Sequence, residues 1–152
     1  MLGGLGALGM TTLTGVLAAP RTAAAQAVGV QETVEVALKR FFGTRPLQDG
    51  SRLIKLEVPL IAENGAVVPV AVQVESPMTP GNHVKHIYIV ADKNRIPIVS
   101  RVTLSPAAGQ AFVGENIRLG ETGDVRAIVE QSDGTLFQVK REVRVTVSGC
   151  AA

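Results

Sequence analysis

The sequence predicts a mostly β, immunoglobulin-like antiparallel β-sandwich of about seven strands, preceded by one short N-terminal helix. Two observations support this prediction, and a third limits it. From residue 52 onward, apolar residues recur with a period of two, in seven short runs separated by Gly, Pro, Asn and Asp. One segment before these runs has helical spacing. The Cys…Trp…Cys pattern of antibody domains is absent from the sequence, so we expect a likeness of architecture alone.

Residues 1–27 are expected to form an export signal. The stretch "MLGGLGALGMTTLTGVLAAP" has no charged side chain, and the small residues of "RTAAAQA" after it suit a signal peptidase. The positive region that normally precedes such a stretch is missing, which favours a twin-arginine signal with a truncated start. Because the stretch is long enough to span a bilayer, an uncleaved leader that anchors the chain in the membrane is the alternative. We expect a periplasmic protein.

The helix is predicted over "VQETVEVALKRFFG". In this segment Val34, Ala37, Leu38 and Phe41 share one face at the spacing of an amphipathic helix. Gly43 follows and supplies a stop signal, since glycine is favoured where a helix ends.

The predicted strands cover residues 52–58, 67–74, 84–92, 97–104, 111–119, 124–131 and 135–147. "AENG" and "SDGT" are tight-turn sequences, because Asn-Gly and Asp-Gly tolerate a positive φ, so each is expected to join antiparallel neighbours. In the last run Val143 and Val145 fall on the inward face, whereas Arg144 falls on the outward face. The prolines at positions 59, 69 and 97 indicate edge strands, strand ends or bulges.

Length and charge limit the classes of function. The 152 residues suit one folded domain, expected over residues 28–147, followed by a C-terminal arm over residues 148–152. The formal net charge is only +2 and aromatic residues make up 3% of the chain, so neither a basic stripe nor a base-stacking platform is predicted. We expect no binding to nucleic acid.

The only cysteine, Cys150, lies in this arm. It is preceded by Ser148 and Gly149 and followed by Ala151 and Ala152, a setting that predicts a mobile thiol. In an oxidising compartment such a thiol pairs elsewhere or stays chemically available. A chance cysteine, an intermolecular disulfide and a metal ligand for a partner are the ordinary alternatives. A mobile thiol without an adjacent base suits a carrier better than an enzyme, so no catalytic residue is predicted.

The other polar residues give no sharper candidate. His83 and His86 are three residues apart, which on a strand places them on opposite faces, so we expect surface histidines and no metal site. The acidic residues of "GENIRLGETGDVRAIVE" are spread over two strands and a turn and are expected to be solvated charges: Glu115, Glu121, Asp124 and Glu130. No cofactor is predicted.

Five segments together resemble one known family. They are "AENGAVVPVAVQVESPM", "HVKHIYIVADKNRIPIV", "IRL", "VRAIVEQSDGTLF" and the terminal "VTVSGC". In this order they resemble SoxY, the sulfur-carrying subunit of the Sox thiosulfate-oxidising system. The resemblance implies a periplasmic carrier that holds sulfur intermediates covalently on Cys150 and turns nothing over itself.

The resemblance also implies partners. They are a SoxZ-like subunit in a heterodimer, a haem c-type enzyme that conjugates thiosulfate to the thiol, a hydrolase that releases sulfate, and a molybdenum-haem sulfane dehydrogenase. The family pattern Gly-Gly-Cys-Gly-Gly is replaced here by Ser148, Gly149, Cys150, Ala151 and Ala152. Each replacement adds a Cβ beside the thiol, so the arm could serve different enzymes or a different thiol or sulfur cargo. A secreted interaction domain that forms an intermolecular disulfide is the alternative from another class.

Overall fold

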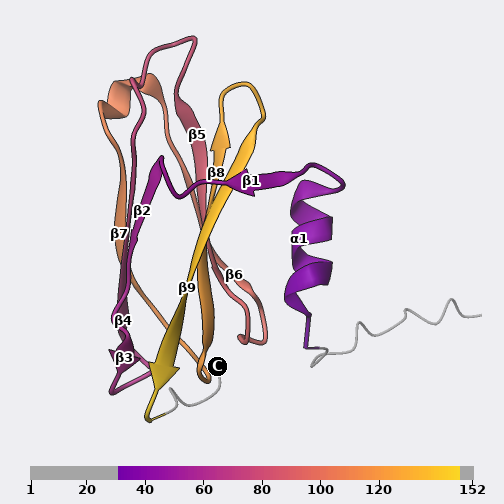
Figure 1. The fold of residues 1–152 in the computed structure, drawn as a ribbon, viewed down its shortest axis with the longest axis vertical. Helices are drawn as coiled ribbons and strands as arrows, with labels where there is room; N and C mark the ends of the chain where they lie inside the picture. The colour runs from indigo at the N-terminus through magenta and orange to yellow at the C-terminus, as the bar shows by residue number, and fades with distance from the viewer. Residues whose placement is uncertain (1–30, 148–152) are drawn as a thin grey trace, which may run out of the picture.

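Nine strands form two facing sheets, and one α-helix covers the outer face of the larger sheet, within residues 31–147, the part of the chain that the computed structural model describes (Figure 1). The expected export signal and the expected arm lie outside these residues. In chain order the elements are α1 (Val34–Phe42), β1 (Leu47–Asp49), β2 (Ile54–Glu57), β3 (Ile61–Ala62), β4 (Val68–Val74), β5 (Val84–Ala91), β6 (Ile98–Thr103), the 3₁₀ turn η1 (Pro106–Ala108), β7 (Ala111–Ile117), β8 (Gly123–Gln131) and β9 (Leu136–Val145).

The larger sheet has the order β1-β9-β8-β5-β6, and β3 also pairs with β9; the smaller sheet has the order β2-β4-β7. All the long strands pair in antiparallel fashion. The short strands β1 and β3 run parallel to β9, one near its start and one at its end. Chain segments far apart in sequence therefore meet along β9, the strand that leads to Val147.

The main core lies between the two sheets. Inward-facing aliphatic side chains of β4, β5, β8 and β9 are fully buried there: Val68, Val70, Val72, Ile87, Ile89, Val125, Val129 and Val143. In β4 the buried valines alternate with exposed or half-buried residues, so the other face of this strand is exposed to solvent. In β5 nearly every residue from Val84 to Ala91 is buried, because the sandwich covers one face and α1 covers the other.

The helix packs on the outer face of the larger sheet through a second cluster. Val34 and Phe42 contact Tyr88 and Ile128 there, and the Phe42 and Tyr88 rings meet edge to face with centroids 4.9 Å apart. Thr33 caps the helix by accepting a hydrogen bond from the N–H of Val36, and Gly43 ends it at φ 62°. The predicted stop at Gly43 is confirmed.

The predicted fold class is confirmed, and the seven predicted strands all form, with ends that differ by at most two residues. The structure adds β1 and β3, which are too short to show a period in the sequence. "AENG" lies in the connection between β2 and β4, which pair in antiparallel fashion, so that prediction is confirmed, although β3 in the same connection pairs with β9. "SDGT" joins the antiparallel strands β8 and β9, with Gly134 at φ 87°.

Candidate functional site

The predicted site residues Ser148, Gly149, Cys150, Ala151 and Ala152 lie outside the described residues. The structure instead defines the place from which the predicted arm starts. We call residues 144–147, at the end of β9, the arm base.

Main-chain hydrogen bonds fix the arm base on the side of β3. The N–H of Thr146 donates to the carbonyl of Ala62 at 3.1 Å, and the carbonyl of Val147 accepts from the N–H of Gly65 at 2.9 Å. The Thr146 hydroxyl adds a bond to the carbonyl of Glu63 at 3.2 Å. The turn after β3 thus holds the chain in place as far as Val147.

A side-chain cap fixes the arm base on its other side. The hydroxyl of Thr122, just before β8, accepts a hydrogen bond from the N–H of Val145 at 2.9 Å. Val143, two residues earlier on the same face, is fully buried between the sheets. The arm base is therefore held by both neighbouring segments and by the core.

Exposed apolar side chains surround the arm base. Seven large hydrophobic side chains are exposed among the described residues, and four of them belong to the arm base or to the segment 60–67 that pairs with it: Leu60, Ile61, Val67 and Val147. Leu60 is 76% exposed and Val147 is 62% exposed. Exposed apolar side chains gathered on one part of a surface are typical of sites of contact with other proteins. We call these four residues the apolar collar.

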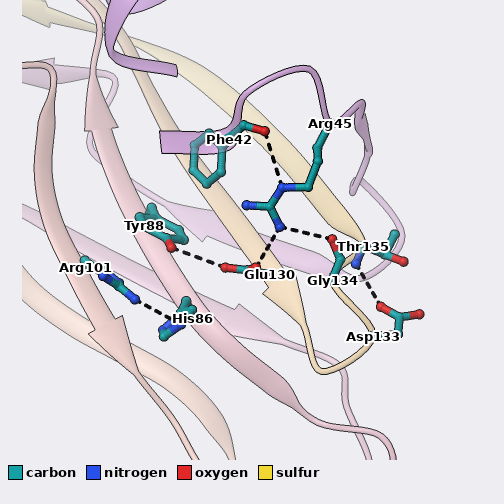
Figure 2. Close-up of polar contacts among 9 residues, drawn as sticks. All are labelled: Phe42, Arg45, His86, Tyr88, Arg101, Glu130, Asp133, Gly134 and Thr135. Carbon is teal, nitrogen blue, oxygen red and sulfur yellow. Dashed lines mark hydrogen bonds and ion pairs between the residues drawn. The ribbon is translucent and has the colours of Figure 1, made fainter. Parts of the chain in front are cut away.

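A second group of polar residues lies beneath α1 and is drawn in Figure 2. Nη1 of Arg45 donates to Oε1 of Glu130 at 2.7 Å, and the Tyr88 hydroxyl donates to the other carboxylate oxygen at 3.3 Å. Nε of Arg45 also donates to the carbonyl of Phe42, the last residue of α1. Glu130 is 9% exposed, so the prediction of a solvated carboxylate is wrong at this position.

His86 continues this group on the adjoining part of β5. Its Nε2 faces the guanidinium of Arg101 at 3.1 Å (Figure 2). Its Nδ1 faces the hydroxyl of Thr103 at 3.1 Å. Because the guanidinium can only donate, Nε2 accepts and the imidazole is neutral. The side chain is 7% exposed, so the prediction of a surface histidine is wrong for His86, while His83 is half-buried.

The pKa shifts in this group have identifiable causes. Burial, and then the charge of Arg101, lower the pKa of His86; burial and the charge of Glu130 raise the pKa of Tyr88. Burial alone would raise the pKa of Glu130, but the hydrogen bond and charge of Arg45 outweigh it and leave that pKa below its ordinary value.

These contacts describe a structural attachment. The carboxylate of Glu130 and the ring nitrogens of His86 each have protein partners, and Arg45 connects the end of α1 to β8. No group of three or more His, Cys, Asp or Glu side chains among residues 31–147 is arranged to hold a metal ion. No helix in the same range is long and apolar enough to span a bilayer.

Sequence reasoning missed two features of this region. One is the pairing of β3 with the end of β9, and the other is the contact between Arg45 and Glu130, which are 85 residues apart. A polar residue among apolar ones in β8 was the available signal for Glu130, because buried carboxylates require a partner.

The family described as sulfur oxidation protein SoxY matches residues 38–150, so the matched region ends at the cysteine. No curated protein matches the chain significantly. The solved structure of the sulfur carrier protein SoxY from Chlorobium limicola f thiosulfatophilum is 32% identical, with a TM-score of 0.62, over 76% of this chain and 97% of that chain.

Other similar structures share the fold alone. A superoxide reductase (neelaredoxin) E23A variant from Ignicoccus hospitalis is 19% identical with a TM-score of 0.56, over 76% of this chain and 89% of that chain. A putative superoxide reductase from Thermotoga maritima is 17% identical with a TM-score of 0.54, over 66% of this chain and 93% of that chain. The family match covers most of the sequence and includes the arm base, and the SoxY structure shares the fold over 76% of this chain. The chain belongs to the SoxY family of sulfur oxidation proteins, and is therefore a sulfur carrier of the Sox system and not itself an enzyme.

Proposed function

We propose that this protein holds sulfur intermediates covalently on Cys150 during thiosulfate oxidation, as the SoxY half of a complex with a SoxZ-like subunit. The export signal, residues 1–27, is removed, and the carrier works in the periplasm. Its other partners are the haem c-type conjugating enzyme, the sulfate-releasing hydrolase and the sulfane dehydrogenase of the Sox system.

The anchored arm base is the observation that carries this proposal. The chain is held by hydrogen bonds on both sides up to Val147, and Cys150 follows three residues later. Three residues reach at most roughly 10 Å, at about 3.3–3.6 Å each. A thiol at this distance can enter the active site of a partner while the folded domain stays outside, which is what a carrier requires.

The apolar collar supports the same proposal. A partner that receives a thiol over roughly 10 Å must approach the domain closely, because the arm cannot bridge a wider gap. Leu60, Ile61, Val67 and Val147 form the surface that this partner meets. Burying these side chains against the rim of an active-site entrance would contribute favourable free energy at about 25 cal/mol per Å² of apolar surface.

The covalent chemistry needs only a thiolate from this chain. The Cys150 thiolate and the sulfane sulfur of thiosulfate form a sulfur–sulfur bond and release two electrons, which the haem c-type conjugating enzyme would accept one at a time. In the hydrolase, water then attacks the terminal sulfone group of this adduct. Sulfate and protons leave, and a persulfide remains on Cys150. A cysteine of ordinary pKa, about 8.5, is mostly protonated at pH 7, so the partner's site must favour the thiolate.

A strain whose only copy of the protein carries Cys150→Ser tests the proposal. We expect normal folding and normal binding to the SoxZ-like subunit but no thiosulfate oxidation, because a hydroxyl cannot replace the thiolate. Ser148→Ala is the matched control and should behave as the wild type. Growth of the Cys150→Ser strain on thiosulfate at the wild-type rate would contradict the proposal.

A relocated thiol tests the reach of the arm. The double variant Cys150→Ser with Ser148→Cys keeps one thiol but moves it two residues closer to the arm base, which shortens its reach by about 7 Å. We expect this variant to fold normally and to lose sulfur transfer. Full transfer by this variant would show that the cysteine does not enter a partner's site.

A further inference from the structure

The larger sheet has an open edge in the middle of β9. On one side β9 pairs with β8 over residues 136–143. On the other side β1 covers only residues 136–138 and β3 only residues 144 and 145. Within the described part of the chain no strand pairs with residues 139–143 on that side.

The main-chain groups at this edge point outward in a defined pattern. The carbonyl of Gln138 accepts from the N–H of Gly50 at 2.9 Å, and the N–H of Arg144 donates to the carbonyl of Leu60 at 2.9 Å. Alternate residues of a strand direct both groups to the same side. Lys140 and Glu142 therefore present two N–H groups and two carbonyls at the open edge, whereas the main-chain groups of Arg141 and Val143 are directed toward β8.

A second open edge faces the first across a groove. β2 pairs only with β4 and so ends the smaller sheet. A cavity of about 1020 Å³ lies between residues 52–56 of one sheet and residues 138–141 of the other. The half-buried Leu53 and Val139 give the groove an apolar floor. An extended segment lying along β9 could complete the ladder and cover this floor.

The charge of the groove indicates the kind of segment that fits. Five basic residues and two acidic residues line it: Arg52, Lys55, Arg126, Lys140 and Arg141, with Asp49 and Glu75. Among residues 31–147 Arg52 and Arg141 form no ion pair. The chain's own residues 1–30 contain Arg21 and no Asp or Glu, so they do not complement this charge.

We propose that an extended, acidic segment of the SoxZ-like subunit adds as a strand to β9, in the gap between β1 and β3. This inference rests on the proposed heterodimer and names the surface that forms it. The segment pairs with Lys140 and Glu142 through its main chain and places acidic side chains near Arg52 and Arg141. The contrary reading is that Lys140 and Arg141 are charges that only keep a bare edge from aggregating.

Residue-resolved amide hydrogen exchange by NMR tests the inference, on the purified chain alone and in complex with the SoxZ-like subunit. We expect the amides of Lys140 and Glu142 to exchange rapidly in the chain alone and to become protected in the complex. The amides of Arg141 and Val143, which face β8, should be protected in both states.

Three variants test the same surface by affinity. Lys140→Pro removes an N–H that the β8 ladder does not use, so the domain should fold, but a strand can no longer pair there. We expect it to weaken subunit binding by at least about tenfold, which corresponds to about 1.4 kcal/mol. Arg141→Glu should weaken binding too, by an amount that shrinks at high salt. Arg118→Glu, which changes the same charge outside the groove, should leave affinity unchanged.

The outcomes separate this inference from the proposed function. A stable complex in which Lys140 and Glu142 stay unprotected, and in which Arg141→Glu binds normally, would overturn the inference but not the heterodimer. Protection that rises with the concentration of the chain alone would identify a second copy as the occupant and also overturn it. If no complex forms, the heterodimer itself is wrong and the inference fails with it.

Discussion

Replacing Arg45 by alanine should weaken the attachment of α1 to the larger sheet. The substitution removes the 2.7 Å ion pair to Glu130 and the hydrogen bond to the carbonyl of Phe42. Breaking a fully buried ion pair costs about 3–5 kcal/mol. The Arg45 side chain is 42% exposed, so water screens the pair, and we expect a loss nearer to 1.5–2 kcal/mol, the size of about one charge-assisted hydrogen bond. The melting temperature should fall by about 5–8 °C.

The pH dependence of this loss identifies its cause. The pKa of Glu130 in the folded protein lies below its ordinary value of 4.5, so the carboxylate stabilises the fold fully at pH values above 4.5. This contribution disappears as the pH falls through the lowered pKa. Arg45→Ala should therefore be most destabilising at about pH 7 and less so at about pH 3, which lies below the ordinary pKa, as measured by urea denaturation at both values.

A matched control separates this ion pair from surface charge in general. Arg144 forms a 3.8 Å contact with Glu142, and both side chains are largely exposed. Arg144→Ala should change the free energy of unfolding by less than about 0.5 kcal/mol at either pH. Equal losses for Arg45→Ala at both pH values, or a loss no larger than that of the control, would refute the role assigned to Glu130.

Three further predictions concern β9, His86 and the residues that flank Cys150. Val143→Asp should destabilise the domain by more than about 4 kcal/mol, because it buries an unpaired charge; a small loss in denaturation would contradict the inward face of β9. The pKa of His86 is lowered, so its neutral form stabilises the fold at pH values above the ordinary pKa of 6.5, and this contribution is lost as the pH falls. His86→Gln should therefore flatten the pH dependence of the free energy of unfolding over this range, and an unchanged pH profile would refute the prediction. Ala151→Gly with Ala152→Gly should keep the melting temperature and give equal or faster thiosulfate loading; slower loading would contradict an obstructive role for these methyl groups.

The strands could be predicted because burial imposes their period. β4 alternates buried valines with exposed residues, and the sequence shows this directly. β5 could be placed only by its β-branched content, since α1 and the sandwich bury both faces and remove the alternation. β3 has two residues and is defined by its partner β9, so no local pattern could reveal it.

The site was predictable in one part and hidden in another. The position of Cys150 after the last strand is a property of the sequence, and so is the replacement of glycines beside it. The hydrogen bonds that hold Thr146 and Val147 depend on a turn more than 80 residues earlier in the chain. Glu130 looked like a surface charge because its partner Arg45 lies 85 residues away, beyond any spacing rule for strands or helices.

Mass spectrometry of the intact protein, isolated from cells grown on thiosulfate, tests most directly whether Cys150 carries sulfur. We predict a population that bears a thiosulfate-derived or sulfane-sulfur adduct, mapped by peptide analysis to Cys150 and removed by reduction. Protein from the Cys150→Ser strain should lack the adduct. A population without adducts, joined entirely through Cys150 as a disulfide-linked dimer, would contradict the carrier and favour a secreted interaction domain.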